Sequence, residues 1–469
     1  MDFFEVLLGV LNKVNDFVWG PPLLVLLVGT GLMLTIRLRL LQVIKLPKAI
    51  KLIFKAENKG EGDINSFAAL CTALAATVGT GNIVGVATAI TSGGPGALFW
   101  MWLAAFFGMA TKYAEGVLAI KYRGVDSNGQ VSGGPMYYIE KGLGKKFKPL
   151  AIFFAVSGIL VALLGIGTFA QVNSIASSIY TVLGVDPKLT SLIVAVLVGI
   201  IVFGGIQSIS KVAEKVVPFM AIVYIAISLI IIGCNYQAII PAFVSVFKGA
   251  FTGTAAVGGF LGATVAQAIQ KGIARGVFSN ESGLGSAPIA AAAAKTEWPA
   301  EQGLISMTGT FIDTIIICTL TGLTILVTGT WNLEGISGAT VTQMSFSKVL
   351  PNVGPYLIMI CLCLFAFTTI LGWCYYGERC LEYLAGVKGI KLYRGIFVAL
   401  IAMGGFLKLE VIWILADIVN GLMAFPNLIG LIGLSGVVVT ETKLYMDHLK
   451  EKETLEKETL EKEALKKVA

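Results

Sequence analysis

The sequence A-T-V-G-T-G-N-I-V-G at residues 76–85 interrupts a strongly apolar part of the chain. No charged side chain occurs from Ile64 to Thr111, and this run is long enough for two membrane crossings. Three glycines and an asparagine disfavour an α-helix between Gly79 and Gly85. Inside a bilayer, a backbone that leaves the helix exposes N–H and C=O groups that need polar partners. We therefore expect a broken helix whose free ends face a polar ligand.

A second stretch of the same kind is G-V-F-S-N-E-S-G-L-G at residues 276–285. It also combines glycines with polar side chains inside an apolar region. Either stretch alone could be explained by close packing of small residues between helices. Two such interruptions at corresponding places in two halves indicate the binding site of a secondary transporter.

The composition is that of a membrane protein. Of the 469 residues, 56% are hydrophobic and 13% are charged, and the mean hydropathy is +0.83, whereas soluble domains carry about 25% charged residues. The net charge of +7 suits basic loops at one membrane face, so we expect the lipid bilayer and no nucleic acid as a partner. The seven cysteines show no metal-ligand spacing with the single histidine, and no G-x-S-x-G motif occurs. We expect neither an enzyme nor a cofactor.

Hydropathy and turn residues predict an all-α polytopic membrane protein with 11 transmembrane helices. Without the first helix, ten remain, and five per half start the second half on the opposite side of the membrane. This predicts a 5+5 inverted repeat in which the broken helices come first. The predicted crossings are 17–36, 65–92, 97–120, 150–180, 189–209, 216–234, 258–294, 303–328, 355–385, 392–408 and 411–438.

The predicted division of the chain has five parts. The parts are 1–62 with an N-terminal interfacial helix, an extra transmembrane helix and a basic cytoplasmic loop, 63–235 as the first repeat, 236–257 as an extracellular connection with a short surface helix, 258–440 as the second repeat, and 441–469 as a charged cytoplasmic tail. On one side of this topology lie 28 of the 35 Lys and Arg residues. The positive-inside rule makes that side cytoplasmic and puts the N-terminus outside the cell membrane.

The two breaks suggest the class of ligand. A helix N-terminus attracts anions and a helix C-terminus attracts cations. Two adjacent breaks therefore suit a zwitterionic amino acid together with a small hard cation held by carbonyl and hydroxyl oxygens.

The stretch G-G-P-G-A-L-F-W-M-W at residues 93–102, followed by Gly108-Met109, resembles the signature of the alanine or glycine:cation symporter family. The G-T-G-N-I and F-S-N-E-S-G-L-G stretches are also similar to that family, so the resemblance runs from Asn65 to about Val438. It implies the amino acid/polyamine/organocation fold of the bacterial leucine transporter. It also implies Na⁺-coupled uptake of L-alanine and glycine, with D-alanine left open as a further substrate.

In an alignment with the leucine transporter, residues 77–82 and 278–285 match the two segments where its helices are broken. The resemblance implies that N–H groups of Thr80 and Gly81 meet the substrate carboxylate. Trp373, one helical turn beyond Thr369, would shorten the side-chain pocket to suit a small substrate. Gln171 is a mid-crossing amide that we expect to face the site rather than to pack between helices. The expected substrate-binding residues are Thr77, Gly79, Thr80, Gly81, Gln171, Gly276, Val277, Phe278, Ser279 and Trp373.

In the same comparison, Thr368 and Thr369 occupy the position of paired hydroxyls that hold a sodium ion. The resemblance adds carbonyl oxygens from three further residues, and a second sodium ion is not expected because Ala76 replaces an asparagine. The expected cation-binding residues are Ala75, Val78, Phe365, Thr368 and Thr369, with Asn82 left open.

Five charged residues in apolar segments suggest gating or coupling. Glu281 lies in the second break and could gate the cytoplasmic side, and Asp417 could form an outer gate with Arg275 or Lys271. Asp313 could serve a cation or pair with Arg275 or Lys271. The sequence thus predicts a sodium-coupled symporter that works by alternating access. A proton-coupled transporter in which Asp313 or Glu281 titrates is the alternative, ahead of a channel or a membrane-embedded enzyme.

Overall fold

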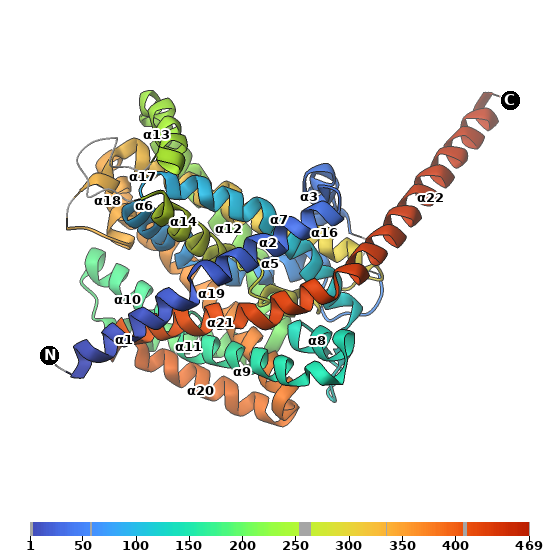
Figure 1. Cartoon of the computed structure of the whole chain (residues 1–469), viewed down its shortest axis with the longest axis horizontal. Helices are drawn as coiled ribbons and strands as arrows, with labels where there is room; N and C mark the ends of the chain where they lie inside the picture. The colour runs from blue at the N-terminus through green and yellow to red at the C-terminus, as the bar shows by residue number, and fades with distance from the viewer. Residues whose placement is uncertain (1–2, 57–58, 253–263, 334, 407–409, 469) are drawn as a thin grey trace.

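The chain is built almost entirely of helices, with one short hairpin (Figure 1). The computed structural model describes residues 3–56, 59–252, 264–333, 335–406 and 410–468. The α-helices are α1 Phe3–Val18, α2 Pro21–Arg37, α3 Leu41–Ile44, α4 Leu46–Lys55, α5 Ser66–Thr77, α6 Val86–Gly93, α7 Gly96–Lys121, α8 Pro135–Leu143, α9 Lys148–Leu164, α10 Phe169–Leu183, α11 Pro187–Val202, α12 Gly205–Cys234, α13 Ile239–Thr252, α14 Val265–Asn280, α15 Ala287–Ala291, α16 Pro299–Thr310, α17 Thr319–Thr328, α18 Ala339–Val349, α19 Gly354–Ala385, α20 Ile390–Met403, α21 Glu410–Gly433 and α22 Ser435–Val468.

Three further elements matter for the site. Two π-helical segments, η1 and η5, continue broken or distorted helices, and an antiparallel hairpin joins α7 to α8. Their bounds are η1 Gly81–Gly85, η5 Phe311–Cys318, β1 Gly124–Val125 and β2 Val131–Ser132.

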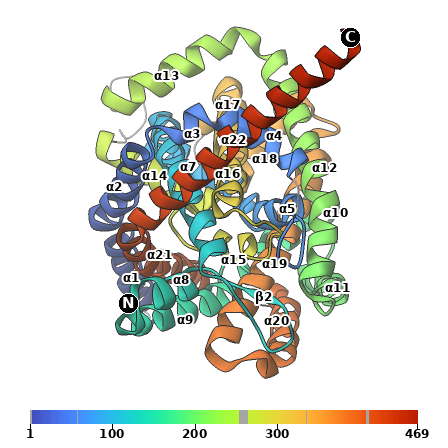
Figure 2. The ribbon, with the colours of Figure 1, turned by 90° about the vertical axis from the view of Figure 1, so that its right-hand side faces the viewer.

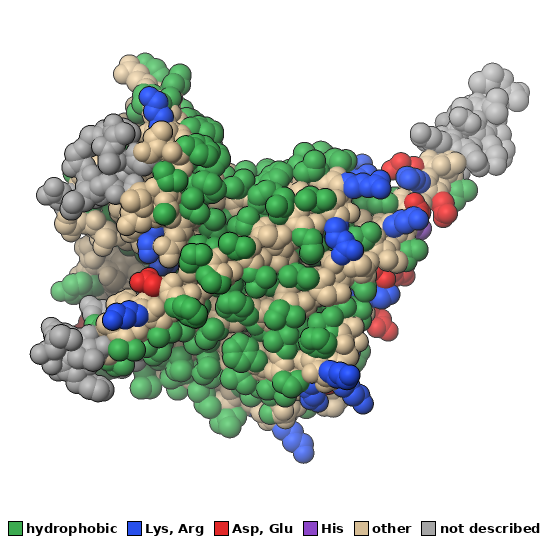
Figure 3. All heavy atoms as spheres, in the orientation of Figure 1, with side chains coloured by type: hydrophobic (Ala, Val, Ile, Leu, Met, Phe, Trp, Pro, Cys, Tyr) green, Lys and Arg blue, Asp and Glu red, His purple; other side chains and the backbone are tan. Residues whose placement is uncertain are grey.

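The described helices form a multi-pass membrane protein. Eight helical segments are long and apolar enough to cross a bilayer, and the bent pair of α5 with the helix that follows it gives a ninth. Apolar side chains cover the middle of the face shown in Figure 3, and basic side chains gather toward its right-hand edge. The all-α polytopic fold is confirmed, whereas the count of eleven crossings and the division into two five-helix repeats stay predictions. The predicted boundary between 257 and 258 lies outside the described residues.

Local sequence explains where the key helices begin. The Asn65 side chain accepts a hydrogen bond from the Ala68 N–H at 2.7 Å and caps α5. Thr264 and Gln267 form a reciprocal capping box at the start of α14. In G-G-P-G, α6 ends at Gly93 and α7 begins at Gly96, as predicted.

The fourth predicted crossing, 150–180, is not one continuous helix. It is interrupted between α9 and α10, at residues 165–168. A Cβ on Gly167 would lie 2.4 Å from the Ala162 carbonyl oxygen and 2.9 Å from the Trp373 Cβ. The helix therefore yields where α19 approaches it closely. As a result, Gln171 lies in the first turn of α10 instead of the middle of a helix.

The N-terminal helix α1 packs against α21 (Figures 1 and 2). The Trp19 indole N–H, just after α1, donates to the Asp417 carbonyl oxygen at 2.9 Å. This contact places the predicted interfacial helix beside residues that the sequence assigns to an outer gate.

Candidate substrate and cation site

The first broken helix bends by 50° between α5 and the helical segment after Thr80. The chain leaves the helix at Val78 and resumes it in η1. The Gly79 N–H donates to Asn82 Oδ1 at 2.8 Å, and the Asn82 N–H donates to the Gly79 carbonyl at 3.2 Å. Asn82 thus supplies the polar partners that a break inside a membrane needs. The break is shorter than the predicted stretch 79–85.

The second broken helix unwinds at Glu281, where the backbone adopts φ 56°. Regular helix resumes in α15. Half of the predicted second stretch is therefore still helical, because Gly276 to Asn280 form the last turns of α14. Carbonyls of the last turn, including those of Phe278 and Ser279, have no later helical N–H to bind.

The two breaks touch each other. A Cβ on Gly81 would lie 3.1 Å from the Ser279 Cα, so the absence of a side chain at residue 81 allows this approach. Gln171, which is 1% exposed, donates from Nε2 to Thr80 Oγ1 at 3.2 Å. The structure therefore brings together Thr80, Gly81, Gln171 and Ser279 from three separate helices.

Asp313 joins the two breaks. Its Oδ1 accepts a hydrogen bond from Asn82 Nδ2 at 2.7 Å, and its Oδ2 accepts one from Ser279 Oγ at 2.9 Å. Thr314 Oγ1 also donates to Oδ2, at 2.8 Å. The side chain is fully buried in η5. Of the two predicted roles, pairing with Arg275 or Lys271 does not occur among the described residues, where Arg275 pairs with Asp417 instead. The role in serving a cation stays a prediction.

The paired hydroxyls of α19 lie against the end of α5. A Cβ on Gly79 would be 2.4 Å from Thr369 Oγ1. Thr368 and Thr369 both donate to the Phe365 carbonyl, at 3.0 and 2.9 Å. Together with the buried residues Ala75 and Val78, they form a compact region where α5 meets α19. Hydroxyl and carbonyl oxygens are the ligands that a hard cation prefers.

A cavity of about 400 Å³ reaches the breaks from one end of the molecule, and we call it the vestibule. Thr80 and Gly81 line it, as do residues of α1, α14 and α21. The Arg275 guanidinium forms an ion pair of 3.3 Å with Asp417 and lies 5.4 Å from the centre of the Phe278 ring. The predicted contact between Arg275 and Asp417 is present in the structure.

Trp373 contacts the second break from α19. Its Nε1 donates to Glu281 Oε1 at 3.1 Å, and Ser286 Oγ donates to Glu281 Oε2 at 2.5 Å. Trp373 and Glu281 are both buried. Trp373 lies one turn beyond Thr369, which contacts the first break.

A buried charged cluster that the sequence analysis did not single out holds the unwound segment after α14. Lys112 Nζ donates to the Asn280 carbonyl at 2.8 Å. Glu115 Oε1 accepts hydrogen bonds from the Gly283 N–H at 3.1 Å and from Asn427 Nδ2 at 2.7 Å. Lys112 and Glu115 share one face of α7. Two opposite charges three residues apart in an apolar helix are the signal that could have identified them.

The ends of the broken helices that lie away from the vestibule are joined to each other. The N–H groups of Asp63 and Ile64 donate to the Ala293 carbonyl, and the Lys295 N–H donates to the Ile64 carbonyl at 2.8 Å. One guanidinium, that of Arg123, reinforces this junction. It donates to the carbonyls of Glu61, Ala292, Ala294 and Thr296.

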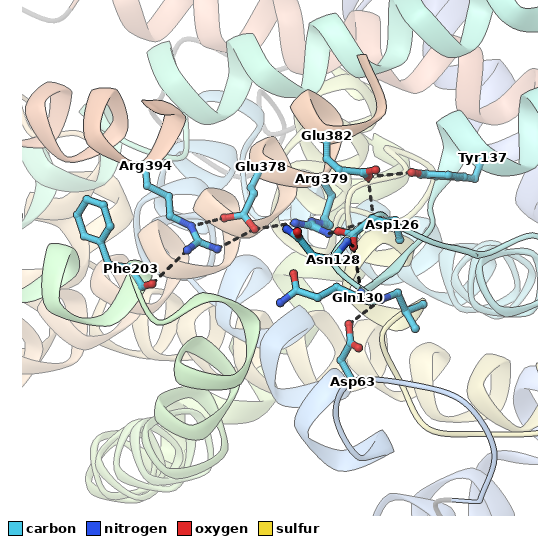
Figure 4. Close-up of polar contacts among 12 residues, drawn as sticks. Asp63, Asp126, Asn128, Gln130, Tyr137, Phe203, Glu378, Arg379, Glu382 and Arg394 are labelled. Atoms are coloured by element: carbon cyan, nitrogen blue, oxygen red, sulfur yellow. Dashed lines mark hydrogen bonds and ion pairs between the residues drawn. The ribbon is translucent and has the colours of Figure 1, made fainter. Parts of the chain in front are cut away.

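The hairpin of β1 and β2 extends this junction to α19 (Figure 4). Asp63 Oδ2 accepts a hydrogen bond from the Val131 N–H at 2.9 Å. Asp126 Oδ2 pairs with Arg379 at 3.0 Å, and both side chains are 1% exposed. Arg379 also contacts Glu378, which binds Arg394 of α20. We call this end of the molecule the hairpin face, and a continuous set of polar contacts closes it.

These features define the class of the protein, a multi-pass transporter with two broken helices at its centre. Solved structures agree on the fold. The structure of MhsT in complex with L-phenylalanine has a TM-score of 0.56 at 12% identity and covers 82% of this chain and 99% of that chain. A manganese transporter of Eremococcus coleocola has a TM-score of 0.51 at 14% identity, with coverages of 81% and 84%. The predicted leucine-transporter type of fold is confirmed.

The chain belongs to the sodium:alanine symporter family, whose model matches residues 4–459. It is 52% identical to the sodium/alanine symporter AgcS of Methanococcus maripaludis, over 96% of this chain and 99% of that protein. It is 56% identical to an uncharacterized transporter of Haemophilus influenzae, over 94% and 97% of the two chains. The probable sodium/glutamine symporter GlnT of Bacillus subtilis is 38% identical, over 94% and 91%. The predicted family is confirmed, and the protein is a transporter and not an enzyme.

Proposed function

We propose that this transporter is a sodium-coupled symporter that imports small neutral amino acids by alternating access. The observation that carries the proposal is the meeting of two helix breaks beside the paired hydroxyls Thr368 and Thr369, at the end of the vestibule. L-alanine and glycine are the proposed substrates, and D-alanine is a third one to test. AgcS, which is named a sodium/alanine symporter, supports this choice.

The backbone of the breaks recognises the part that all amino acids share. The N–H groups of Thr80 and Gly81 bind the carboxylate, and the carbonyls of Thr77, Phe278 and Ser279 bind the ammonium group. Gly79 lets the backbone approach the ligand, and Gly276 and Val277 complete the last turns of α14. The close contact between Gly81 and Ser279 supports this arrangement, because it sets both groups of backbone atoms around one position.

The sodium ion binds between α5 and α19. Its ligands are the carbonyls of Ala75, Val78 and Phe365 and the hydroxyls of Thr368 and Thr369. An ion there pulls the end of α5, which also carries substrate ligands, against α19. Occupancy by sodium therefore organises the amino-acid site, which is the coupling that a symporter needs.

The vestibule opens to the outside of the cell membrane, and the hairpin face is cytoplasmic. The orientation is supported by the excess of Lys and Arg in the loops and tail that the predicted topology puts on the cytoplasmic side. It also puts the N-terminus outside. Arg275 and Asp417 form the outer gate, because their ion pair lines the vestibule and the guanidinium lies over the Phe278 ring. Residues 236–257 form an extracellular connection, and the tail 441–469 is cytoplasmic.

Uptake into proteoliposomes tests the proposal. We expect labelled alanine and glycine to accumulate when sodium is present outside, and not when choline replaces it. One charge moved across 100 mV supplies about 2.3 kcal/mol, which corresponds to roughly 50-fold accumulation. Accumulation that is independent of sodium would contradict the coupling. A screen in which none of the twenty amino acids binds would contradict the substrate class.

A proton-coupled transporter of the same fold is the second candidate. Asp313 favours it, because a fully buried carboxylate there bonds to Asn82 of the first break and to Ser279 of the second. Protonation of that group would alter contacts at both breaks. Uptake driven by an imposed pH gradient in choline medium, and abolished in Asp313→Asn, would establish this candidate in place of sodium coupling.

A further inference from the structure

We propose that Glu281 is a positioning residue for substrate selection. Its carboxylate holds the indole of Trp373, and the held indole limits the size of the amino-acid side chain that the site accepts. This inference rests on the proposed function, since it assigns the means by which that site rejects larger amino acids. It gives Glu281 a role in selection instead of the gate role that its place in the second break suggests.

Both carboxylate oxygens of Glu281 are engaged. Oε1 accepts the Trp373 Nε1–H at 3.1 Å, and Oε2 accepts the Ser286 hydroxyl at 2.5 Å. Glu281 is 3% exposed and Trp373 is fully buried. The indole N–H is the single hydrogen-bonding group of a tryptophan side chain. Glu281 therefore satisfies the whole polar requirement of Trp373.

Glu281 is held by contacts on both sides of the unwound segment, with the end of α14 and with the residue before α15. Its N–H closes α14 by donating to the Val277 carbonyl at 2.8 Å. Its φ of 56° lies in the left-handed region, which residues other than glycine rarely adopt. Ser286, the residue just before α15, holds the carboxylate from the other side. The acceptor presented to the indole is thus anchored to both halves of the broken helix.

Trp373 occupies the place where α19 passes the breaks. Thr369, one turn earlier, contacts Gly79 of the first break. The interruption at Gly167 accommodates the Trp373 Cβ, and Tyr376 meets the indole edge-on with 5.5 Å between ring centres. Trp373 thus contacts the second break through Glu281, one turn from the residue that contacts the first, and in the proposal this large rigid ring is one wall of the side-chain pocket.

A wall excludes larger side chains only when it cannot move aside. Overpacking is costly because the surrounding groups are held in place. An indole without its hydrogen-bond partner can rotate about its side-chain torsions, whereas it costs free energy for a buried N–H that has an acceptor to leave that acceptor. Removing the acceptor should therefore reduce discrimination between amino acids before it reduces the binding of alanine.

The test measures how well valine and leucine compete with labelled alanine on the purified full chain in sodium medium. Glu281→Met removes the acceptor, and Glu281→Gln keeps an oxygen that can accept the indole N–H. We expect the affinity for leucine relative to alanine to rise about tenfold in Glu281→Met, which corresponds to about 1.4 kcal/mol. In Glu281→Gln the ratio should remain close to that of the wild type.

A double-mutant cycle separates positioning from direct contact with substrate. Trp373→Phe removes the indole N–H and keeps an aromatic ring. In the Trp373→Phe background, Glu281→Met should cause no further change in the ratio, because the contact is already absent. An unchanged ratio in Glu281→Met, or a full additional change in the double variant, overturns the proposal.

Two further variants complete the experiment. If Glu281→Met does not fold, Ser286→Ala replaces it, because it frees the second oxygen of Glu281 and should shift the ratio in the same direction. An unchanged ratio in Ser286→Ala then overturns the proposal. Tyr376→Phe keeps the ring contact with Trp373 and is the matched control. Failure of the wild-type protein to bind any amino acid would count against the proposed function, and it is distinguishable from an unaltered ratio.

Discussion

Gly79 of the first break lies directly against Thr369 of α19, since a Cβ at residue 79 would be 2.4 Å from the Thr369 hydroxyl oxygen. A threonine side chain is stiff at χ1 and cannot easily move aside. Gly79→Ala should therefore push α5 away from α19, with an overpacking cost of about 1–3 kcal/mol. We expect a lower melting temperature and weaker apparent sodium affinity.

The effect of the contact between Gly79 and Thr369 can be isolated by making Gly79→Ala in a Thr369→Ala variant as well as in the wild type. In Thr369→Ala the hydroxyl oxygen is gone, so Gly79→Ala should lower the melting temperature by less than in the wild type. Gly85→Ala is the matched control, because a Cβ there would meet nothing within 4 Å. Equal losses of stability in both backgrounds would contradict the contact as the cause.

Replacing both hydroxyls of the proposed sodium site should affect the ion more than the choice of amino acid. For Thr368→Ala combined with Thr369→Ala, we expect the sodium concentration at half-maximal uptake to rise at least about tenfold, a change of about 1.4 kcal/mol. Thr72→Ala is the control, since its hydroxyl makes the same kind of bond within α5, to the Ala68 carbonyl. Unchanged sodium dependence in the double variant would remove both residues from the site.

Loss of the acid at the proposed outer gate should slow the transport cycle. Asp417→Asn weakens the ion pair with Arg275, which is partly exposed to the vestibule. We expect uptake to fall several-fold while equilibrium binding of alanine is largely kept. Asp16→Asn also removes an acid of the vestibule, but one that forms no part of the pair, and serves as the control. Equal losses of binding and uptake would place Asp417 in the substrate site itself.

Trimming Trp373 should admit larger amino acids. Burial of each added CH₂ favours a longer side chain by about 0.8 kcal/mol, so rejection of leucine must be steric. We expect Trp373→Ala and Trp373→Leu to gain binding of valine or leucine and to keep alanine binding. Competition of labelled alanine by each amino acid measures this. A variant that still rejects all larger side chains while binding alanine would show that Trp373 is not the size filter.

Breaking the closure of the hairpin face should expose the interior from that side. The hairpin ties the start of the first broken helix to α19 through Asp63 and through the pair of Asp126 with Arg379. In Asp126→Asn and in Arg379→Gln, we expect a cysteine at Ala73→Cys to react roughly tenfold faster with an impermeant thiol reagent added at the hairpin face. That factor corresponds to about 1.4 kcal/mol in the population of open molecules.

Mass spectrometry at residue 73 reports this reaction without removal of the native cysteines. Ala73 lines a small cavity with Thr77 and Lys112, and it lies in α5 between Asp63 at the hairpin face and the first break. Glu441→Gln breaks a separate ion pair with Lys121, of 2.6 Å, and should leave the rate unchanged. Labelling at the wild-type rate in both Asp126→Asn and Arg379→Gln would show that the closure does not depend on this pair.

The sequence predicted the breaks because glycine and asparagine in an apolar run conflict with a continuous helix. It also led to Gln171 and to the pair of Arg275 with Asp417, since isolated polar groups in apolar segments need partners. The structure brings Gln171 to Thr80 and Arg275 to Asp417. The roles of these residues in binding and gating stay predictions.

Other features depend on contacts that sequence periodicity does not reveal. The π-helical segment around Asp313 has no signal in the hydropathy pattern. The interruption at Gly167 lies where the chain approaches Trp373 of α19, a contact that sequence periodicity does not reveal. Helix propensity also did not show that residues 276–280 stay helical, because their glycine lies in a helix packed against α7. Lys112 lies within the predicted crossing 97–120, and periodicity gives no sign that its ammonium group is buried against Asn280.

The partners of Lys112 and Glu115 have a consequence for biosynthesis. Asn280 lies 168 residues after Lys112, and Asn427 lies 312 residues after Glu115. A chain made from its N-terminus therefore presents α7 to the bilayer long before those partners exist. Until then, the two charges have mainly each other, three residues apart on one helix face. Stable insertion of α7 must await the second half of the chain, so nascent chains that end before residue 280 should leave this helix poorly anchored.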